Sequence, residues 1–395
     1  MPKKRVLLRA PLLTVSGYGV HSRQIFEYLY EQSDVDLHVE VLNWGQTSWM
    51  VNANSENGLA GKIMSCSKKL QPPYDYTFQV QLPDEWNPKL GRKNIGISAF
   101  VETDRCNTKW VEKCNEMDLV IAPSTFTKDV VQRSGNVTKP FYVVPEWFNT
   151  NLLKDNETVL RELAEEKFNF ITPFNVMLLG QLTGQDPWSD RKNIFFTIKW
   201  FFETFADRPD VGLILKTNSG KSTLIDKKIT ESVVTNLIKE VRKGPFPKVH
   251  LLHGNLSSEE VASLYHHPKV FGFISATRGE GYGLPLVDAA AAGVPVLATN
   301  WSGHLEFLKE GLFTAVNYQL KNIPKNKIDN RIFFEGTKWA EVNEQDFKSK
   351  LRGLYNNIET PKSNAAELKE LVQEKFSKKA VCRKYNQILK KHFRW

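Results

Sequence analysis

The sequence predicts an α/β protein built from two successive doubly wound domains, each with a parallel sheet. Three observations predict this fold. Short apolar runs alternate with helical segments, the alternation starts again after about residue 170, and glycine loops precede helix starts in both halves. With 395 residues the chain is long enough to bury two cores of ordinary size.

Each half has its own series of predicted strands. The apolar runs of the first half are 6–8, 37–42, 76–80, 95–101, 119–121 and 141–144, and those of the second are 175–179, 212–215, 249–252, 270–274 and 294–298. Ligands of such sheets bind beyond the carboxyl ends of the strands. We therefore expect one domain over residues 1–165 and another over 166–377, with a ligand in the cleft between them.

The segment 278–299 carries the most specific pattern in the chain. Its glycine loop runs into a helix start at Pro285, and Gly293 follows the short alanine-rich helix, the two positions where these residues are favoured. Unpaired amides at a helix start attract phosphate or sugar oxygens. Glu280 and Asp288 flank that start, so the sequence predicts an anion-binding loop with two carboxylates beside it.

Composition excludes several classes of protein. Apolar residues make up 41% of the chain and charged residues 25%, and no apolar run approaches the roughly 18–20 residues needed to cross a bilayer. The start lacks the apolar core and cleavage site of a secretory signal. The four cysteines show no zinc or redox spacing, so reduced thiols are expected. We expect a cytoplasmic protein that is at most peripheral at a membrane.

Positive charge is concentrated at the C-terminal end. Residues 321–395 hold 18 Lys and Arg against 9 Asp and Glu, an excess equal to the net charge of +9 of the whole chain. Such a segment suits contact with nucleic acid, an anionic membrane or a polyanionic glycan. A solvated helix surface explains the same pattern equally well, because acidic residues are interleaved with the basic ones.

The acidic pair carries a resemblance to a known family. Glu280-x7-Asp288, with Gly-Tyr-Gly-Leu-Pro between, resembles the Glu-x7-Glu signature of retaining GT-B glycosyltransferases of the family-4 type, the glycosyl transferases group 1. Arg191-Lys192-Asn193 is similar to the diphosphate-binding basic motif of that family. Three further segments, 102–112, 117–126 and 298–307, follow in the order that the family has, and the resemblance spans roughly residues 5–310.

The resemblance implies a GT-B fold and a role for each matched residue. The first domain would bind the acceptor, the second would bind a nucleotide-diphosphate sugar, and a C-terminal helix at about 378–395 would pack back onto the first. Glu280 would hold the hydroxyls of the sugar, Asp288 the ribose diol, and Lys192 and Arg191 the diphosphate. Further donor-binding positions are Gly17, Gly19, Gln181, Lys216, Gly281, Tyr282, Gly283 and Leu284.

The sequence departs from the family pattern at several positions. The second acid is Asp288, one methylene shorter than the usual glutamate, and Gln181 stands where many relatives have an arginine. An insertion, 183–190, precedes Arg191, which we expect to supply the missing cation. Glu102 lies near the place of a first-domain histidine. We take it as a candidate for substrate contact, with a buried structural carboxylate as the alternative.

The expected function is transfer of a sugar to an acceptor hydroxyl with retention of anomeric configuration, by an enzyme that uses neither a metal nor a cofactor. The acceptor would be a glycan or a lipid-linked saccharide. Two alternatives stay open: the same chemistry on a modified DNA base, as in viral base glycosylation, and a non-catalytic subunit that binds nucleotide sugars. Asp34-Val-Asp36 matches the metal motif of another glycosyltransferase class, but it lies where acidic turn residues are common.

Overall fold

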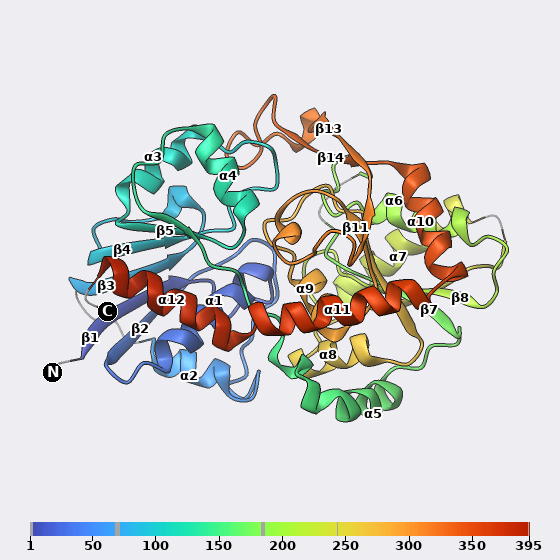
Figure 1. Ribbon diagram of the computed structural model, residues 1–395, viewed down its shortest axis with the longest axis horizontal. Coiled ribbons are helices and arrows are strands. Elements are labelled where there is room, and N and C mark those ends of the chain that lie inside the picture. The colour runs from blue at the N-terminus through green and yellow to red at the C-terminus, as the bar shows by residue number, and fades with distance from the viewer. Residues whose placement is uncertain (1–2, 68–71, 183–185, 243, 394) are drawn as a thin grey trace. The chain divides into compact units, whose positions relative to one another are not determined.

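A computed structural model describes residues 3–67, 72–182, 186–242, 244–393 and 395, and it divides the chain into two compact units. Unit 1 consists of Met1–Trp147, Asp329–Thr337 and Lys378–Trp395, and unit 2 of Phe148–Ile328 and Lys338–Ser377. Both are α/β units with a parallel sheet, labelled by element in Figure 1.

Unit 1 is built on a six-stranded sheet in the order β2-β1-β3-β4-β5-β6, with every pair parallel. Its strands are β1 (Lys4–Ala10), β2 (Val35–Val41), β3 (Tyr74–Val80), β4 (Gly91–Ile97), β5 (Leu119–Ala122) and β6 (Phe141–Val143). Its helices are α1 (Gly17–Tyr30), α2 (Leu59–Ser65), η1 (Pro83–Glu85), α3 (Thr108–Glu116), α4 (Thr125–Ser134) and α12 (Lys378–His392).

The glycine loop of the first half forms the start of α1. Ser16 is its N-cap, and its side chain accepts a hydrogen bond from the backbone N–H of Gly19 at 3.0 Å. A Cβ at Gly19 would lie 2.0 Å from the carbonyl oxygen of Thr14, so only glycine allows this close approach of helix and loop.

Unit 2 has a second six-stranded parallel sheet, in the order β12-β11-β10-β7-β8-β9, and an antiparallel pair β13-β14. Its strands are β7 (Phe174–Leu179), β8 (Val211–Lys216), β9 (Lys248–Leu252), β10 (Val270–Ser275), β11 (Val296–Thr299), β12 (Thr314–Val316), β13 (Tyr318–Asn322) and β14 (Lys338–Val342). Its helices are η2 (Thr150–Leu152), η3 (Lys154–Asn156), α5 (Glu157–Lys167), α6 (Ile194–Thr204), α7 (Leu224–Val241), α8 (Ser258–His266), α9 (Leu284–Ala292), η4 (Gly303–Glu306), η5 (Lys325–Lys327), α10 (Glu344–Asn356) and α11 (Glu359–Lys375).

The register of the second sheet brings the ends of several strands to one edge. Leu179 at the end of β7 pairs with Lys216 at the end of β8, and Ser275 at the end of β10 pairs with Ala298 in β11. The loops that carry Arg191, Lys192 and Glu280 follow β7 and β10. The sheet therefore delivers both loops to its carboxyl edge, where ligands of doubly wound sheets bind.

The units differ from the predicted domains in two places. The division falls after Trp147 rather than after residue 165, because Leu160 and Ala164 of α5 are buried in the core of unit 2. The segment Asp329–Thr337 groups with unit 1, where Arg331 forms ion pairs with Asp84 and Glu85. Sequence periodicity gives no signal for a contact between segments so far apart in the chain.

The C-terminal segment groups with unit 1, the arrangement that the family resemblance implies. Val381, Tyr385 and Leu389 of α12 are buried in the core of that unit, and the ring of Tyr385 stacks on that of Tyr28 in α1. In Figure 1 α12 is drawn in red beside α1. An apolar face at helical spacing is thus covered by the sheet and α1. Lys378 forms ion pairs with Glu27 and Glu31 of α1, and the exposed basic side chains of α12 are Lys379, Arg383, Lys390 and Lys391.

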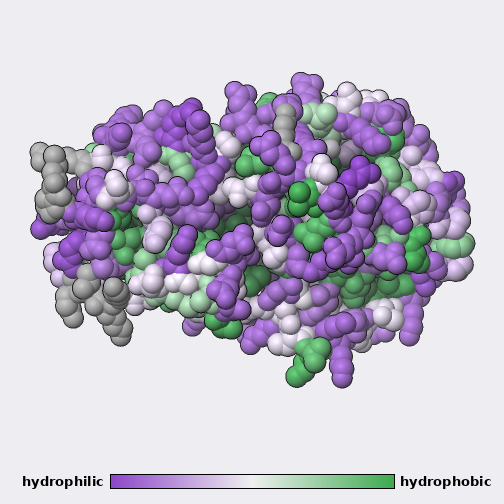
Figure 2. Space-filling model, turned by 90° about the horizontal axis from the view of Figure 1, so that it is seen from below, coloured by the Kyte–Doolittle hydropathy of each residue, from purple (hydrophilic) through white to green (hydrophobic). Residues whose placement is uncertain are grey.

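Hydrophilic side chains dominate the face seen in Figure 2, and hydrophobic ones lie among them in small groups. Within the described residues, no helix combines the length and the apolar composition that crossing a membrane requires.

Candidate active site

The loop before α9 has the geometry that its glycines and proline predict. Gly283 is the N-cap of α9 with φ 103°, Pro285 follows in the first turn, and Gly293 ends the helix with φ 77°. Both angles lie in the left-handed region, which glycine adopts at no steric cost. The helix therefore starts abruptly beside Glu280, as the sequence predicts.

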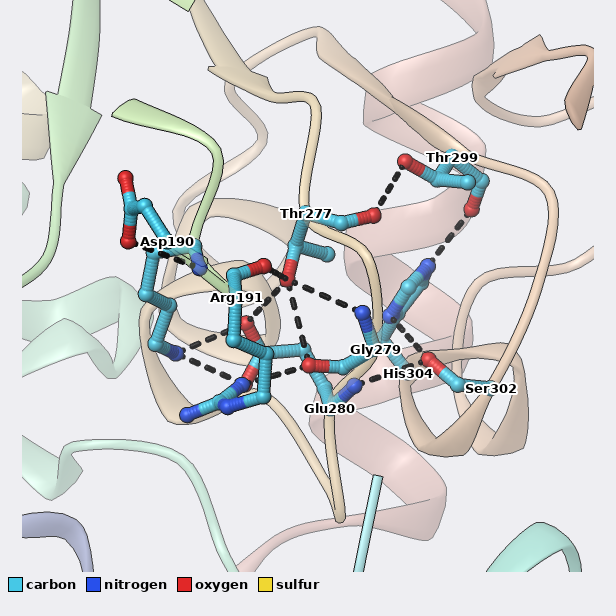
Figure 3. Close-up of polar contacts among 9 residues, drawn as sticks. Asp190, Arg191, Thr277, Gly279, Glu280, Thr299, Ser302 and His304 are labelled. Atoms are coloured by element: carbon cyan, nitrogen blue, oxygen red, sulfur yellow. Dashed lines mark hydrogen bonds and ion pairs between the residues drawn. The ribbon is translucent and has the colours of Figure 1, made fainter. Parts of the chain in front are cut away.

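Glu280 lies at the centre of a cluster of charged and polar groups. Its two carboxylate oxygens each lie 2.7 Å from the Lys192 ammonium, and one accepts a hydrogen bond from the Thr277 hydroxyl at 3.0 Å. The Arg191 guanidinium lies 3.5 Å from the same carboxylate and also donates to the carbonyl of Gly279. Figure 3 shows Arg191, Thr277 and Gly279 gathered around Glu280. The sequence-predicted catalytic residues of unit 2 are thus brought together.

Electrostatics keep Glu280 ionised in spite of its burial. Burial acts to raise the pKa of this carboxyl, but the charges of Lys192 and Arg191 outweigh it and lower the pKa to about 2. A carboxylate with a low pKa accepts hydrogen bonds at every physiological pH, the role needed to hold sugar hydroxyls.

The segment after β11 fixes the backbone of Glu280. The Ser302 hydroxyl accepts from the N–H of Glu280 at 2.9 Å, and the N–H of Gly303 donates to its carbonyl at 2.8 Å. Nε2 of His304 lies 2.7 Å from the carbonyl oxygen of Thr299, and burial of the ring lowers its pKa. The segment at Ser302 and Gly303, about twenty residues further along the chain, therefore holds the backbone of the loop that carries Glu280.

Gly303 offers a direct test of this loop. An added Cβ would lie 2.1 Å from the carbonyl oxygen of Gly281 and 2.7 Å from that of Glu280, so Gly303→Ala must displace the backbone that carries Glu280. We expect the sugar transfer that the family resemblance implies to fall by about 100-fold and the protein to lose about 1–3 kcal/mol of stability, measured by initial rates and thermal unfolding. Gly353→Ala in α10 is the matched control, because nothing lies within 4 Å of its Cβ. Full activity of Gly303→Ala would contradict the need for this loop geometry.

The two cations are held by the start of α6. One carboxylate oxygen of Asp190 accepts from the N–H of Ile194 at 2.6 Å and the other from the N–H of Lys192 at 3.2 Å. Asn193 has φ 55°, and its side-chain amide donates to the carbonyl of Ala276 at the end of β10. These contacts aim the side chains of Arg191 and Lys192 at Glu280. Of the predicted insertion 183–190, residues 183–185 lie outside the described part of the chain.

Asp288 lies on α9 and contacts backbone rather than a cation. Its carboxylate accepts from the N–H of Asn149 at 2.8 Å, and the Asn149 side chain donates to the carbonyl of Ser258 in α8. Burial raises the pKa of Asp288 to about 7, although the hydrogen bond from Asn149 acts to lower it. Binding of the ribose diol by the Asp288 carboxylate stays a prediction.

The raised pKa of Asp288 predicts a pH dependence of stability. The folded protein holds this proton more tightly than the unfolded chain does, whose aspartate keeps the ordinary pKa of 3.8. The resulting stabilisation is full below pH 3.8 and is lost as the pH rises to about 7. We expect the free energy of unfolding of wild type, relative to Asp288→Asn, to decrease over this range in urea titrations and to stay level above it. A difference that does not change with pH would contradict the raised pKa.

The other predicted donor-binding residues of unit 2 lie around the same edge. The Lys216 ammonium donates to the carbonyl of Gly254 at 2.6 Å, and burial lowers its pKa. Gln181 follows β7 and is partly exposed. The ring of Tyr282 is buried against Phe307, so a donor contact of Tyr282 would have to come from its backbone. A small pocket at this edge is lined by Leu178, Leu179, Lys192, Ile194, Phe273, Ser275, Glu280, Gly283, Pro285 and Leu286.

The first-domain candidates lie in unit 1. Gly17 begins α1, and Glu102 follows β4 as a partly buried side chain. Nearby, the hydroxyl of Tyr18 contacts Ser98 at 3.0 Å, and its ring stacks on that of Trp44 with 3.8 Å between centroids. Whether this group meets the same ligand as Glu280 stays a prediction.

Sequence reasoning missed several supporting residues. Thr277, Asp190 and Ser302 bind the functional loops directly, and Arg278 is fully buried behind them. An arginine three positions after the end of a buried strand is the one signal that the sequence offered, because charged side chains are almost never fully buried unless paired.

Comparison with known proteins adds to this geometry. Residues 231–330 match the family description "Glycosyl transferases group 1". This match covers 100 of the 395 residues. Over 274 residues, the chain is 23% identical to the protein named "Probable sucrose-phosphate synthase" of Thermosipho melanesiensis. That match covers 65% of the chain and 56% of the relative, so the chain spans little more than half the length of that protein.

Solved structures of similar fold cover nearly the whole chain. A structure of HepE from Anabaena with UDP and glucose has a TM-score of 0.63 at 14% identity, with 98% of this chain and 100% of that one covered. A sucrose-phosphate synthase from Thermosynechococcus elongatus has a TM-score of 0.64 at 15% identity, with 98% and 99% covered. A glycosyltransferase from Rickettsia africae gives 0.60 at 15% identity, with 99% of each chain covered. The GT-B fold implied by the motifs is thereby confirmed.

Proposed function

We propose that the chain transfers a sugar from a nucleotide-diphosphate sugar to an acceptor hydroxyl, with retention of anomeric configuration. The observation that carries the proposal is the cluster at the start of α9, where Glu280 is ion-paired with Lys192 and Arg191. One carboxylate and two cations at the edge of a doubly wound sheet suit a ligand that has sugar hydroxyls beside a diphosphate.

In this scheme the chemistry depends on where charge develops. The bond between the anomeric carbon and the β-phosphate oxygen breaks, and its electron pair goes to that oxygen. Lys192, Arg191 and the amides of 281–284 stabilise the charge there, and they act more strongly on the transition state than on the bound donor. The acceptor hydroxyl attacks from the same face and passes its proton to the departing phosphate. Glu280 orients the sugar, and Asp288 receives the ribose diol.

A saccharide acceptor, free or lipid-linked, is supported by unit 1. The ring of Tyr18 in α1 stacks on that of Trp44, which follows β2, and Glu102 follows β4. Aromatic faces beside a few polar groups are typical of small-ligand sites, and the C–H face of a pyranose packs well on such rings. UDP-glucose is the first donor to test, because HepE of Anabaena has been crystallised with it.

A thermal-shift screen against UDP-, GDP- and ADP-linked sugars tests donor binding. A donor at 100 times its dissociation constant adds about 2.7 kcal/mol of stability. Mass spectrometry of donor mixed with saccharide acceptors then tests transfer, and NMR of the product reports its anomeric configuration. Binding with no turnover on any acceptor would support the alternative of a non-catalytic subunit, and a product of inverted configuration would contradict the mechanism.

A second acceptor class is favoured by the charge of the C-terminal segment. Residues 378–395 contain seven Lys and Arg and no acidic residue. Val381, Tyr385 and Leu389 occupy the buried face of α12, and the basic side chains of Lys379, Arg383, Lys390 and Lys391 are exposed. A DNA acceptor would use them, and binding to duplex DNA would then weaken steeply with salt. Glycosylated bases in mass spectra after incubation with DNA and donor would establish this alternative, and their absence would exclude it for the DNA used.

A further inference from the structure

Arg278 is a buried cation that has no role in the proposed reaction. Its side chain is 0% exposed and lies between β14 and the loop before α6. Nη1 donates to the carbonyls of Pro187 at 3.0 Å and Asp190 at 2.6 Å, and Nε donates to the Glu341 carboxylate at 3.2 Å. The guanidinium thus ties three chain segments together.

Two aromatic rings enclose the same guanidinium. Its central carbon lies 5.7 Å from the ring centroid of Phe196 in α6 and 5.5 Å from that of Trp339 in β14. Both distances lie within the range of cation–π contacts. The planar group is therefore fixed by rings as well as by hydrogen bonds, a combination that lysine cannot reproduce.

The backbone of Arg278 holds the same loop. Its N–H donates to the carbonyl of Arg191 at 2.9 Å, and its carbonyl accepts from the N–H of Ala340 at 3.0 Å. Arg191 and Lys192 are consequently anchored on one side by Arg278 and on the other by the Asp190 side chain. Each contact acts on the dipeptide whose side chains reach Glu280.

Stability alone does not explain an arginine at this position. Removing a guanidinium from water is costly, and a well-packed apolar side chain of similar volume is often at least as stable. Within the described residues, Nη2 of Arg278 has no hydrogen-bond partner, so the burial is not fully compensated. An arginine here is explained if the loop of residues 187–191 has to be held in one position.

We propose that Arg278 is a positioning residue that sets the Arg191-Lys192 cations for the diphosphate of the donor. The proposal rests on the proposed function, because it assumes that these cations meet a diphosphate. Arg278 then affects only the contacts made with the diphosphate part of the donor. Loss of the guanidinium weakens binding of phosphates and slows transfer, while the contacts with the nucleoside stay intact.

The test compares nucleotides with nucleosides on folded variants. Isothermal titration of wild type with UDP, GDP and ADP shows which nucleoside diphosphate binds most tightly. The affinity for the nucleoside with the same base is then measured in parallel. For Arg278→Met and Arg278→Lys we expect diphosphate affinity to fall by about tenfold, nucleoside affinity to stay unchanged, and kcat to fall by about 100-fold. Arg278→Lys should retain more diphosphate affinity and a higher kcat than Arg278→Met, since an ammonium can still reach one carbonyl.

Two further variants separate positioning from general stability. Arg208→Met is the matched control: Arg208 also pairs with a carboxylate, Asp210 at 3.1 Å, and lies 4.6 Å from the ring centroid of Tyr355, but it precedes the amino end of β8. It should lower Tm without changing diphosphate affinity. Glu341→Gln removes the ionic partner of Arg278 from a side chain that is 19% exposed, and it should give a smaller loss of diphosphate affinity in the same direction.

The outcomes are distinct. The positioning role is overturned if a variant binds the diphosphate and the nucleoside equally more weakly than wild type. It is also overturned if the ratio of the two affinities is unchanged in every variant that folds. If neither Arg278 variant folds, the ratio in Glu341→Gln decides, and an unchanged ratio there also overturns it. Failure of wild type to bind any of the three diphosphates instead contradicts the proposed function.

Discussion

Replacing Lys192 with alanine should reduce sugar transfer by about 100- to 1,000-fold while the protein stays folded. The ammonium lies 2.7 Å from both oxygens of Glu280, at the edge where the diphosphate of the donor would lie. In the proposed reaction, negative charge grows on the leaving phosphate as the glycosidic bond breaks. A fixed cation therefore stabilises the transition state more than the ground state, and its loss should appear mainly in kcat.

Steady-state kinetics with the donor found by thermal shift measure this effect. Lys199→Ala is the matched control, because Lys199 lies on the adjoining helix α6 and forms a surface ion pair with Glu203 at 2.8 Å. It should leave transfer unchanged, since such exposed pairs contribute little. Lys192→Arg keeps the charge and should retain more activity than alanine. Wild-type kcat in Lys192→Ala would remove Lys192 from the proposed chemistry.

Much of the fold follows from local sequence, and the site follows in part. Alternating apolar runs and helical segments give both sheets, because parallel strands need continuous apolar residues and crossover helices. The start of α9 at Gly283 and Pro285 follows from backbone chemistry. The family motifs assign Arg191, Lys192 and Glu280 to one ligand, a role that stays a prediction. The structure adds that Lys192 and Glu280, 88 residues apart in the chain, are in direct contact, which spacing alone could not indicate.

What the sequence could not provide depends on tertiary contacts. Nothing local indicates that Ser302 and Gly303 bind the backbone of Glu280, or that Asp329–Thr337 packs with unit 1. The raised pKa of Asp288 arises from burial that only the folded chain creates. Gly19 is a related case: the sequence predicts a ligand-binding glycine, whereas its contact with Thr14 already requires glycine for packing.

Replacing Glu280 with glutamine should separate donor binding from transfer. The amide has the shape of the carboxylate but carries no charge, so Lys192 and Arg191 lose their shared counter-ion. Both cations then pair with the diphosphate without competition, and affinity for the nucleoside diphosphate should stay equal to wild type or increase. Transfer should fall by about 100-fold or more, because the sugar is no longer held in the reactive orientation.

The stability of Glu280→Gln gives an independent check. Lys192 and Arg191 hold the pKa of Glu280 at about 2 against the opposing effect of burial, below the ordinary value of 4.5. The stabilisation from the ionised group is therefore present above pH 4.5 and lost as the pH falls to about 2. The variant should be less stable than wild type at neutral pH, and this difference should shrink in acid, as measured by chemical unfolding at several pH values.

Glu203→Gln is the control for both measurements. Glu203 also has two lysine partners, Lys199 and Lys348, and a lowered pKa, but it lies on the surface of α6. Its replacement should leave both donor affinity and kcat unchanged. If Glu280→Gln weakens diphosphate binding and leaves kcat intact, the carboxylate acts on the phosphates through the two cations. The assignment of Glu280 to the sugar hydroxyls would then be wrong.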